Sequence, residues 1–263
     1  MSNLWDRTKE KRLNRIDYAR DINARSIYPN NFNAGTMISL HTNASPNPAV
    51  HGLSIYFENR TGEGEKIAKS IICYMKEQLI KTKAYPSFRF NETPKIDTGE
   101  HAEVASTRAK NVLIELGFHT NRQDAALLQN KDFQQRSMLG VEKGYRLYLG
   151  GERECKPFSF KDANDVVIPM NTVGKVTVHY DGFPVFPVVA TMRIKHCTPT
   201  PSSQCGYDEP IFDSVDHQID YKISCNCPNG STAHTFSTAY TVTLRDADDV
   251  ITDEKDVTVT CKL

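Results

Sequence analysis

The chain has 263 residues, of which 39% are hydrophobic, so it is long enough for two modest domains that each have an apolar core. Its 32 lysine and arginine residues balance 32 aspartate and glutamate residues, and this neutral charge gives no reason to expect nucleic acid as a partner. No apolar run approaches the roughly 18 residues that a membrane-spanning helix needs.

Residues 1–25 are charged and have a helical pattern. Four apolar residues of this segment fall on one stripe: Leu13, Ile16, Ala19 and Ile22. The segment lacks the continuous apolar core of about 7 to 15 residues that a secretory signal peptide has. We expect an ordinary surface helix ahead of the first strand.

Two apolar runs each contain one polar side chain. The run Thr36–Leu40 ends at His41. As a strand buried on both faces, it would deliver the imidazole to the carboxyl edge of an α/β sheet, where such sheets keep their chemistry. The run Val112–Phe118 carries Glu115 between two large aliphatic residues. A carboxylate there costs several kcal/mol to desolvate unless a cation, a proton or a donor compensates it.

Each of these residues has an ordinary explanation as well. A single histidine at the end of a strand is more often a satisfied edge or core residue than a ligand. For Glu115, a salt bridge, a protonated acid and a metal site all remain open.

The chain between the two runs contains a strand and a helix. Residues 53–57 read as a short strand, and residues 62–83 as a helix whose apolar stripe fits packing on a sheet face. Cys73 lies off that stripe, so we expect a lone thiol.

Residues 84–110 are polar and irregular, which is typical of a segment that shapes a binding cleft. His101 and Glu103 lie in this segment and could approach the site. Solvent-facing loop residues are the default interpretation of both.

After the second run, Asn121 has the position of a helix N-cap, with Asp124 in the first turn. Residues 131–149 read as the last helix, in which Gly140 and Gly144 would allow close approach to the sheet. The pair Gly150-Gly151 marks the domain boundary.

Beyond this boundary the apolar pattern changes from helical to alternating. Three segments alternate in this way: residues 175–180, 240–244 and 257–261. With turn residues between them, such runs predict an antiparallel β-sandwich of immunoglobulin-like type.

Six of the seven cysteines fall in this second domain: Cys155, Cys197, Cys205, Cys225, Cys227 and Cys261. An even number in a small domain predicts a disulfide framework and an oxidising compartment. Cys197 and Cys205 enclose a proline-containing turn and are the pair that we expect first. A zinc ribbon is the alternative, but the sequence has no Cys-x-x-Cys pair.

Three stretches of the first domain form an ordered set of motifs. They read Ser39-Leu40-His41-Thr42-Asn43-Ala44, then Gly52-Leu53-Ser54-Ile55-Tyr56-Phe57, then Ile114-Glu115-Leu116-Gly117-Phe118-His119-Thr120-Asn121. In this order they resemble the zinc-dependent N-acetylmuramoyl-L-alanine amidases of bacterial cell walls, the family with an amidase-3 type domain. The resemblance covers roughly Leu13 to Leu149.

The resemblance implies a fold, a site and a substrate. The fold would be α/β, a partial open twisted sheet with flanking helices over residues 1–149, followed by a smaller all-β immunoglobulin-like sandwich over residues 150–263. His41 would be a zinc ligand and Glu115 the catalytic carboxylate that moves the proton of a zinc-bound water. The substrate would be peptidoglycan, cut at the amide between N-acetylmuramic acid and L-alanine.

The sequence departs from this family ahead of His41. Family members carry two further ligands there, a histidine in an Asp-x-Gly-His-Gly turn and a glutamate on the next helix. No histidine precedes His41 in this chain. One ligand does not hold a catalytic zinc ion, which ordinarily has three protein ligands and an open position.

Two hypotheses follow. In the first, the chain is an exported zinc amidase of the periplasm or cell exterior whose first strand, first helix and signal peptide are missing, and its activity as written is impaired. In the second, the chain is a non-catalytic remnant that binds muropeptide or a protein. A different peptidase with ligands from His51, His101 or Glu58 is a third possibility, but these positions share no ligand spacing with His41.

Overall fold

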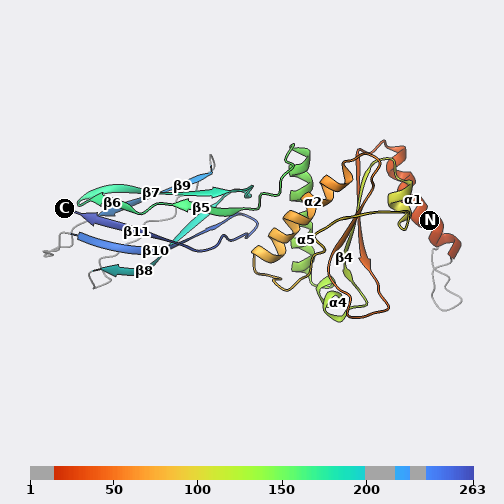
Figure 1. Ribbon diagram of the computed structural model, residues 1–263, viewed down its shortest axis with the longest axis horizontal. Coiled ribbons are helices and arrows are strands. Elements are labelled where there is room, and N and C mark those ends of the chain that lie inside the picture. The colour runs from red at the N-terminus through yellow and green to blue at the C-terminus, as the bar shows by residue number, and fades with distance from the viewer. Residues whose placement is uncertain (1–14, 199–216, 226–234) are drawn as a thin grey trace. The chain divides into compact units, whose positions relative to one another are not determined.

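The structure is a computed structural model that describes residues 15–198, 217–225 and 235–263, with the backbone alone for residues 15–19. Contacts divide the chain into two compact units (Figure 1). Unit 1 consists of Met1–Leu79 and Tyr85–Cys155, and unit 2 of Ile80–Ala84 and Lys156–Leu263. No helix in the described ranges is long and apolar enough to cross a membrane.

Unit 1 is built on a four-stranded sheet with the order β1-β4-β2-β3. Its strands are β1 (Thr36–Asn43), β2 (Ser54–Phe57), β3 (Lys95–Ile96) and β4 (Lys110–Phe118). β4 runs parallel to β1 and antiparallel to β2, and β3 runs parallel to β2. β4 lies between β1 and β2 and is almost wholly buried, as its continuous apolar run predicts.

The β1 strand is more exposed than we expected. The sequence predicts burial on both faces, but most of β1 is half-buried, and Leu40 is 51% exposed. Within the described part of the chain, β1 is an edge strand that pairs with β4 alone. An apolar run does not show whether neighbours cover it, so the prediction of full burial is wrong.

Within the described residues, five α-helices accompany the sheet. They are α1 (Arg15–Asn31), α2 (Gly64–Lys76), α3 (Ala102–Ser106), α4 (Arg122–Leu128) and α5 (Lys131–Leu149), and a π-helical segment η1 (Glu77–Lys81) continues α2. The predicted apolar stripe of α2 is buried throughout. Asn121 caps α4 as predicted, because its side chain accepts hydrogen bonds from the backbone N–H groups of Gln123 and Asp124.

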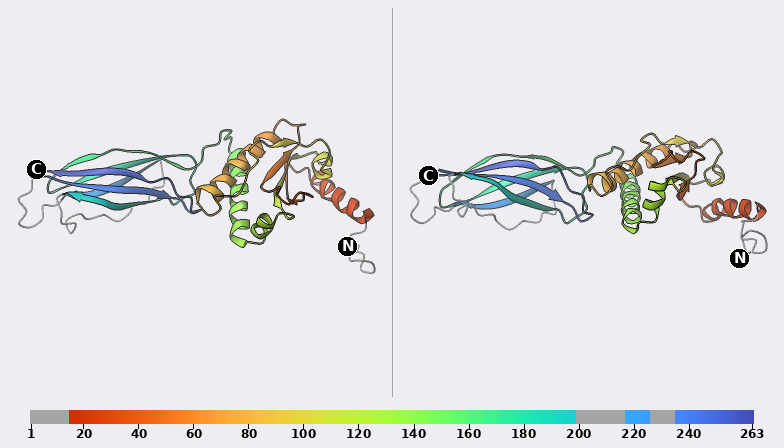
Figure 2. Two further views of the ribbon diagram at one scale, coloured as in Figure 1. Left: turned by 60° about the horizontal axis from the view of Figure 1, so that its bottom comes forward. Right: turned by 90° about the horizontal axis from the view of Figure 1, so that it is seen from below.

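The α5 helix packs closely on α2 (Figures 1 and 2). A Cβ atom on Gly140 would lie 2.5 Å from Cα of Met75, and one on Gly144 would lie 2.7 Å from Cα of Ile71. We expected these glycines to let the helix approach the sheet. They instead let two helix backbones approach each other, so that prediction is wrong about the partner.

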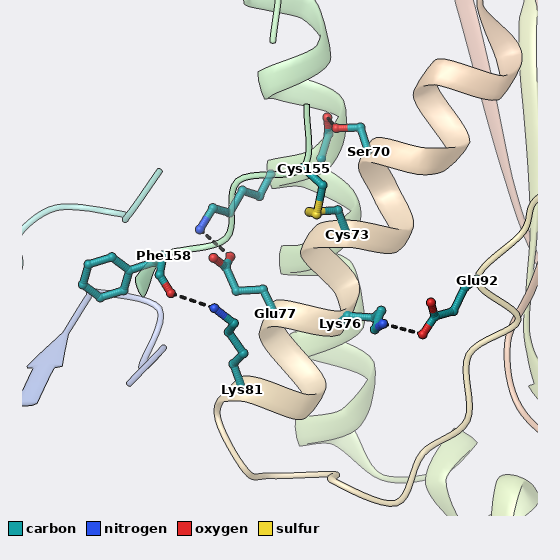
Figure 3. Close-up of a disulfide and its surroundings, with 10 residues drawn as sticks. Ser70, Cys73, Lys76, Glu77, Lys81, Glu92, Cys155 and Phe158 are labelled. Carbon is teal, nitrogen blue, oxygen red and sulfur yellow. Dashed lines mark hydrogen bonds and ion pairs between the residues drawn. A yellow bond between two sulfur atoms is a disulfide. The ribbon is translucent and has the colours of Figure 1, made fainter. Parts of the chain in front are cut away.

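A disulfide joins Cys73 of α2 to Cys155, with the Cα atoms 5.7 Å apart (Figure 3). The prediction of a lone thiol at Cys73 is therefore wrong. Cys73 is only 4% exposed, and the apolar stripe does not mark it because its partner Cys155 lies 82 residues away in the chain. Cys155 accordingly belongs with unit 1 and not with the β-domain framework.

Unit 2 contains two sheets, with the strand orders β6-β11-β10-β8 and β5-β7-β9. Their bounds are β5 (Ser159–Ala163), β6 (Val166–Pro169), β7 (Thr172–Asp181), β8 (Val189–Thr198), β9 (Gln218–Cys225), β10 (Thr235–Arg245) and β11 (Lys255–Lys262). Both sheets contribute to one hydrophobic core, and burial alternates along β7 and β10 as their sequences predict.

One strand pair departs from the antiparallel arrangement that we predicted. β6 runs parallel to β11, while the other described pairs of unit 2 are antiparallel. The chain passes from β5 in one sheet to the edge of the other sheet and joins β11 in the same direction. The immunoglobulin-like type stays a prediction.

A second disulfide, between Cys225 of β9 and Cys261 of β11, links the two sheets of unit 2. Their Cα atoms are 5.5 Å apart. The predicted Cys197–Cys205 pair is not tested, because Cys205 lies outside the described residues.

Candidate functional site

His41 and Glu115 lie side by side on neighbouring strands. They are direct partners in the parallel register of β1 and β4, so both side chains project from the same face of the sheet. The register shifts immediately after this pair, between His41 and Asn43. The roles predicted for the two residues stay predictions.

The end of β4 is held in place by a buried carboxylate. Asp124 is 2% exposed and accepts hydrogen bonds from the backbone N–H of Phe118 at 2.9 Å and of Gly52 at 2.7 Å. These bonds tie the start of α4 to the loop before β2. The position of Glu115, three residues before Phe118, is therefore set by contacts that reach across unit 1.

Glu115 is a buried carboxyl group, 6% exposed. Its Oε2 atom has no hydrogen-bond partner among the described residues. Burial raises the pKa of Glu115, electrostatic interaction with His41, His101 and His119 opposes this, and the charge of Glu103 adds to it. A buried carboxyl group with a raised pKa is a candidate for proton transfer.

Glu103 of α3 contacts His41 directly. Its Oε2 atom lies 2.5 Å from Nε2 of His41, and its Oε1 atom accepts a hydrogen bond from Nη1 of Arg25 at 3.1 Å. The Glu103 side chain is only 5% exposed. Arg25 in turn contacts Asp21 at 2.6 Å, so a chain of charges extends from α1 to the end of β1.

His101 reaches the same site from the loop ahead of α3. Its Nε2 atom is 3.7 Å from Oε1 of Glu115, and its Nδ1 atom is 2.7 Å from Oδ1 of Asp97. The default prediction that His101 and Glu103 face solvent is wrong. The sequence does contain a signal for the Asp97–His101 contact, because Asp97 stands four residues before His101 in a segment that is rich in turn residues.

The other candidate ligands have different surroundings. Glu58 is 2% exposed, and its carboxylate accepts hydrogen bonds from the backbone N–H of Arg60 and Thr61. It therefore stabilises its own turn. His51 is half-buried ahead of β2. A pocket of about 430 Å³ has Glu58, Arg60 and Asp97 in its lining.

The described residues do not fit a resident zinc ion. They contain no group of three or more His, Cys, Asp or Glu side chains arranged to hold a metal. The Nε2 atom of His41, a nitrogen that a metal would use, is in contact with Glu103. A catalytic zinc site needs three protein ligands, so the zinc prediction for His41 receives no support from this geometry.

Comparison with known proteins supplies the family. A family model described as N-acetylmuramoyl-L-alanine amidase matches residues 5–144, which is 140 of the 263 residues. No curated protein matches the chain.

Several solved amidase structures are similar to part of this chain. The CwlD amidase from Clostridioides difficile, solved in complex with the GerS lipoprotein, is 20% identical, with 56% of this chain and 71% of that chain covered and a TM-score of 0.47. An N-acetylmuramoyl-L-alanine amidase from Clostridium difficile 630 is 21% identical, with 50% and 66% covered and a TM-score of 0.43. AmiC2 of Nostoc punctiforme is 20% identical, with 48% and 64% covered and a TM-score of 0.42.

The family assignment rests on the sequence match, which covers more than half of the chain and includes both motif strands of the site. The chain is a member of the amidase-3 family of N-acetylmuramoyl-L-alanine amidases.

Proposed function

We propose that this chain acts on peptidoglycan as an N-acetylmuramoyl-L-alanine amidase that cuts the amide between N-acetylmuramic acid and L-alanine of the stem peptide. The observation that carries the proposal is the placement of Glu115, a buried carboxyl group in register with His41 within the matched family region. Burying a carboxyl group that is not fully hydrogen-bonded is costly, and this cost supports a chemical role for Glu115.

Glu115 is the proton-transfer residue in this proposal. As a carboxylate it accepts a proton from the attacking water, and as an acid it returns the proton to the leaving nitrogen. Burial raises its pKa, which favours the acid form more than in an exposed glutamate.

Zinc, which the family resemblance implies, would activate the attacking water when bound. Because the described side chains do not fit the ion, we assign no step to it. We propose that Glu115 alone activates the water in the chain as given. Cleavage by this chain is therefore slow.

A second candidate function is binding of muropeptide without cleavage. The contact between Glu103 and His41 favours it, because this contact occupies the imidazole nitrogen on the buried side of the site. In that case the same face of the sheet would bind muropeptide without cleaving it.

We also propose that residues 1–149 carry this function and that residues 150–263 form a separate β-domain of immunoglobulin-like type. The natural compartment would be the periplasm or the cell exterior, where the substrate lies. Two disulfides, Cys73–Cys155 and Cys225–Cys261, support an oxidising compartment.

The test is incubation of the purified full chain with isolated peptidoglycan. Amidase activity creates new L-alanine amino termini, which amine labelling and mass spectrometry detect, and metal analysis of the same sample measures zinc. The matched control is Glu142→Gln, because Glu142 is an exposed α5 residue paired with Arg146.

We expect new L-alanine termini with the wild-type chain and with the control, and their loss with Glu115→Gln. Co-sedimentation with peptidoglycan and no new termini would instead support the binding function. If the chain neither binds nor cuts peptidoglycan, both candidate functions are wrong.

A further inference from the structure

Asp97 and His101 form a hydrogen-bonded pair beside the buried carboxyl group. Nδ1 of His101 lies 2.7 Å from Oδ1 of Asp97, and the Asp97 side chain is 2% exposed. The His101 side chain is 22% exposed, so part of it is accessible to solvent. The pair therefore connects a buried carboxylate to a ring that faces the site.

Asp97 itself is held firmly. Its carboxylate accepts hydrogen bonds from the backbone N–H of Gly99 at 3.1 Å and of His101 at 3.2 Å. Its own N–H donates to the carbonyl oxygen of Phe57 in β2 at 2.9 Å. Asp97 is thus fixed to the sheet on one side and to the His101 backbone on the other.

The His101 ring is also fixed by packing. The ring of Tyr56 packs against it in a tilted arrangement, with the centroids 4.6 Å apart and an interplanar angle of 50°. With Nδ1 bound to Asp97 and one ring face on Tyr56, Nε2 points to Oε1 of Glu115 at 3.7 Å. A distance of this size in a ligand-free site is compatible with a hydrogen bond that shortens when substrate binds.

This contact pattern selects one protonation form of the ring. An ionised carboxylate only accepts hydrogen bonds, so Nδ1 must carry a proton where it meets Asp97. In the neutral ring, Nε2 is then the nitrogen with a free lone pair, and it faces Glu115. The ionisable groups that act on the neighbouring Glu115 are His101 itself, His41 of β1, His119 after β4 and Glu103 of α3.

We propose that His101 is a second proton-transfer residue of the amidase site and that Asp97 is the residue that positions it. This inference rests on the proposed function. The proton that Glu115 removes from water passes to Nε2 of His101: the O–H bond of the Glu115 carboxyl group breaks, an N–H bond forms, and Glu115 is again a carboxylate. Asp97 stabilises the resulting imidazolium until the N–H bond at Nε2 breaks and the proton returns to the Glu115 carboxylate, which passes it to the leaving nitrogen.

The chain contains a matched control pair in unit 2. Nδ1 of His179 lies 2.6 Å from Oδ1 of Asp162, but these side chains are 38% and 49% exposed. The pair therefore reproduces the hydrogen bond without the burial, and it belongs to the β-domain.

The experiment combines histidine NMR with kinetics on the full chain. Two-bond proton–nitrogen spectra report which ring nitrogen carries the proton, and His101→Asn assigns the His101 signals. We expect a protonated Nδ1 in the wild-type chain and a shift of the proton to Nε2 in Asp97→Asn, because the asparagine amide donates where the carboxylate accepted.

Activity is measured as new L-alanine termini. His101→Asn places an amide nitrogen near the position of Nδ1 and keeps the Asp97 bond, but it has no atom at the position of Nε2. We expect it to lower kcat at least about tenfold with little change in KM. His101→Gln, which places a polar atom near the position of Nε2 but cannot accept a proton, should lose about as much activity as His101→Asn, and Asp162→Asn should behave as wild type.

An unchanged His101 tautomer in Asp97→Asn would overturn the positioning role. Wild-type kcat in His101→Asn would overturn the proton-transfer role. If the wild-type chain releases no L-alanine termini, the proposed function fails together with the reaction role of His101, and the NMR result still decides whether Asp97 positions the ring.

Discussion

Replacing Glu115 with glutamine should abolish most amide cleavage and at the same time stabilise unit 1. The side chain is 6% exposed, and its Oε2 atom has no hydrogen-bond partner among the described residues. General acid–base catalysis contributes about 10²- to 10⁴-fold, so we expect kcat to fall by that factor. Exchanging a buried carboxylate for a neutral amide of similar shape removes the cost of burying a charge, which should raise the free energy of unfolding by about 1 to 3 kcal/mol near neutral pH.

The pH dependence follows from the direction of the pKa shift. Burial raises the pKa of Glu115 above its ordinary value of 4.5. The folded chain therefore binds this proton more tightly than the unfolded chain does. The stabilisation from the protonated acid is complete below pH 4.5 and is lost as the pH rises through the raised pKa. Glu115→Gln has no carboxyl group at this position to ionise. The difference in free energy of unfolding between this variant and the wild-type chain should therefore grow as the pH rises.

Urea unfolding of the wild-type chain and of Glu115→Gln at several pH values measures this difference, and labelling of new L-alanine termini measures activity. A variant that is less stable than wild type at every pH would refute the reasoning about burial. Retained activity in a folded variant would show that Glu115 does not transfer the proton.

Three further predictions concern unit 1. Replacing Cys73 and Cys155 with serine should lower the free energy of unfolding by about 4.5 kcal/mol, from the separation of 82 residues. Chemical denaturation measures this loss, and a loss below about 1 kcal/mol would contradict it. Gly140→Ala should cost about 1 to 3 kcal/mol, because the new Cβ would lie 2.5 Å from a backbone atom of α2. An unchanged melting temperature in Gly140→Ala would show that α2 and α5 can move apart at little cost in stability. Glu63, whose pKa is lowered to about 2 by hydrogen bonds from Lys66 and Tyr148, should contribute stability above pH 4.5 that is lost as the pH falls toward 2. Carboxyl NMR shifts report its titration, and a midpoint near 4.5 would exclude these bonds in solution.

Each of these predictions has a control within the chain. Gly150→Ala should be tolerated, since its Cβ would lie no closer than 3.4 Å to the nearest atom. Removing the Cys225–Cys261 disulfide, with a separation of 36 residues, should cost about 3.8 kcal/mol, less than the longer loop. Tyr148→Phe should raise the pKa of Glu63, because one of its two side-chain donors is lost.

The local elements and the two motif strands could be predicted from the sequence. The apolar run around Glu115 indicates a buried strand, and β4 is one. The stripe on α2 and the cap at Asn121 follow from the helical period and from side-chain chemistry, and both are confirmed. Such features depend on residues that are near one another in the chain, so periodicity and capping rules describe them.

The rest of the site depends on contacts that no local pattern records. Glu103 and His101 lie in an irregular segment, and only the fold brings them to His41 and Glu115. The same holds for the pairing of Cys73 with Cys155, which are 82 residues apart. Sequence alone therefore determined which strands carry the acid and the imidazole. The tertiary structure decided what surrounds them, because burial and hydrogen bonding depend on distances in space between segments that lie far apart in the chain.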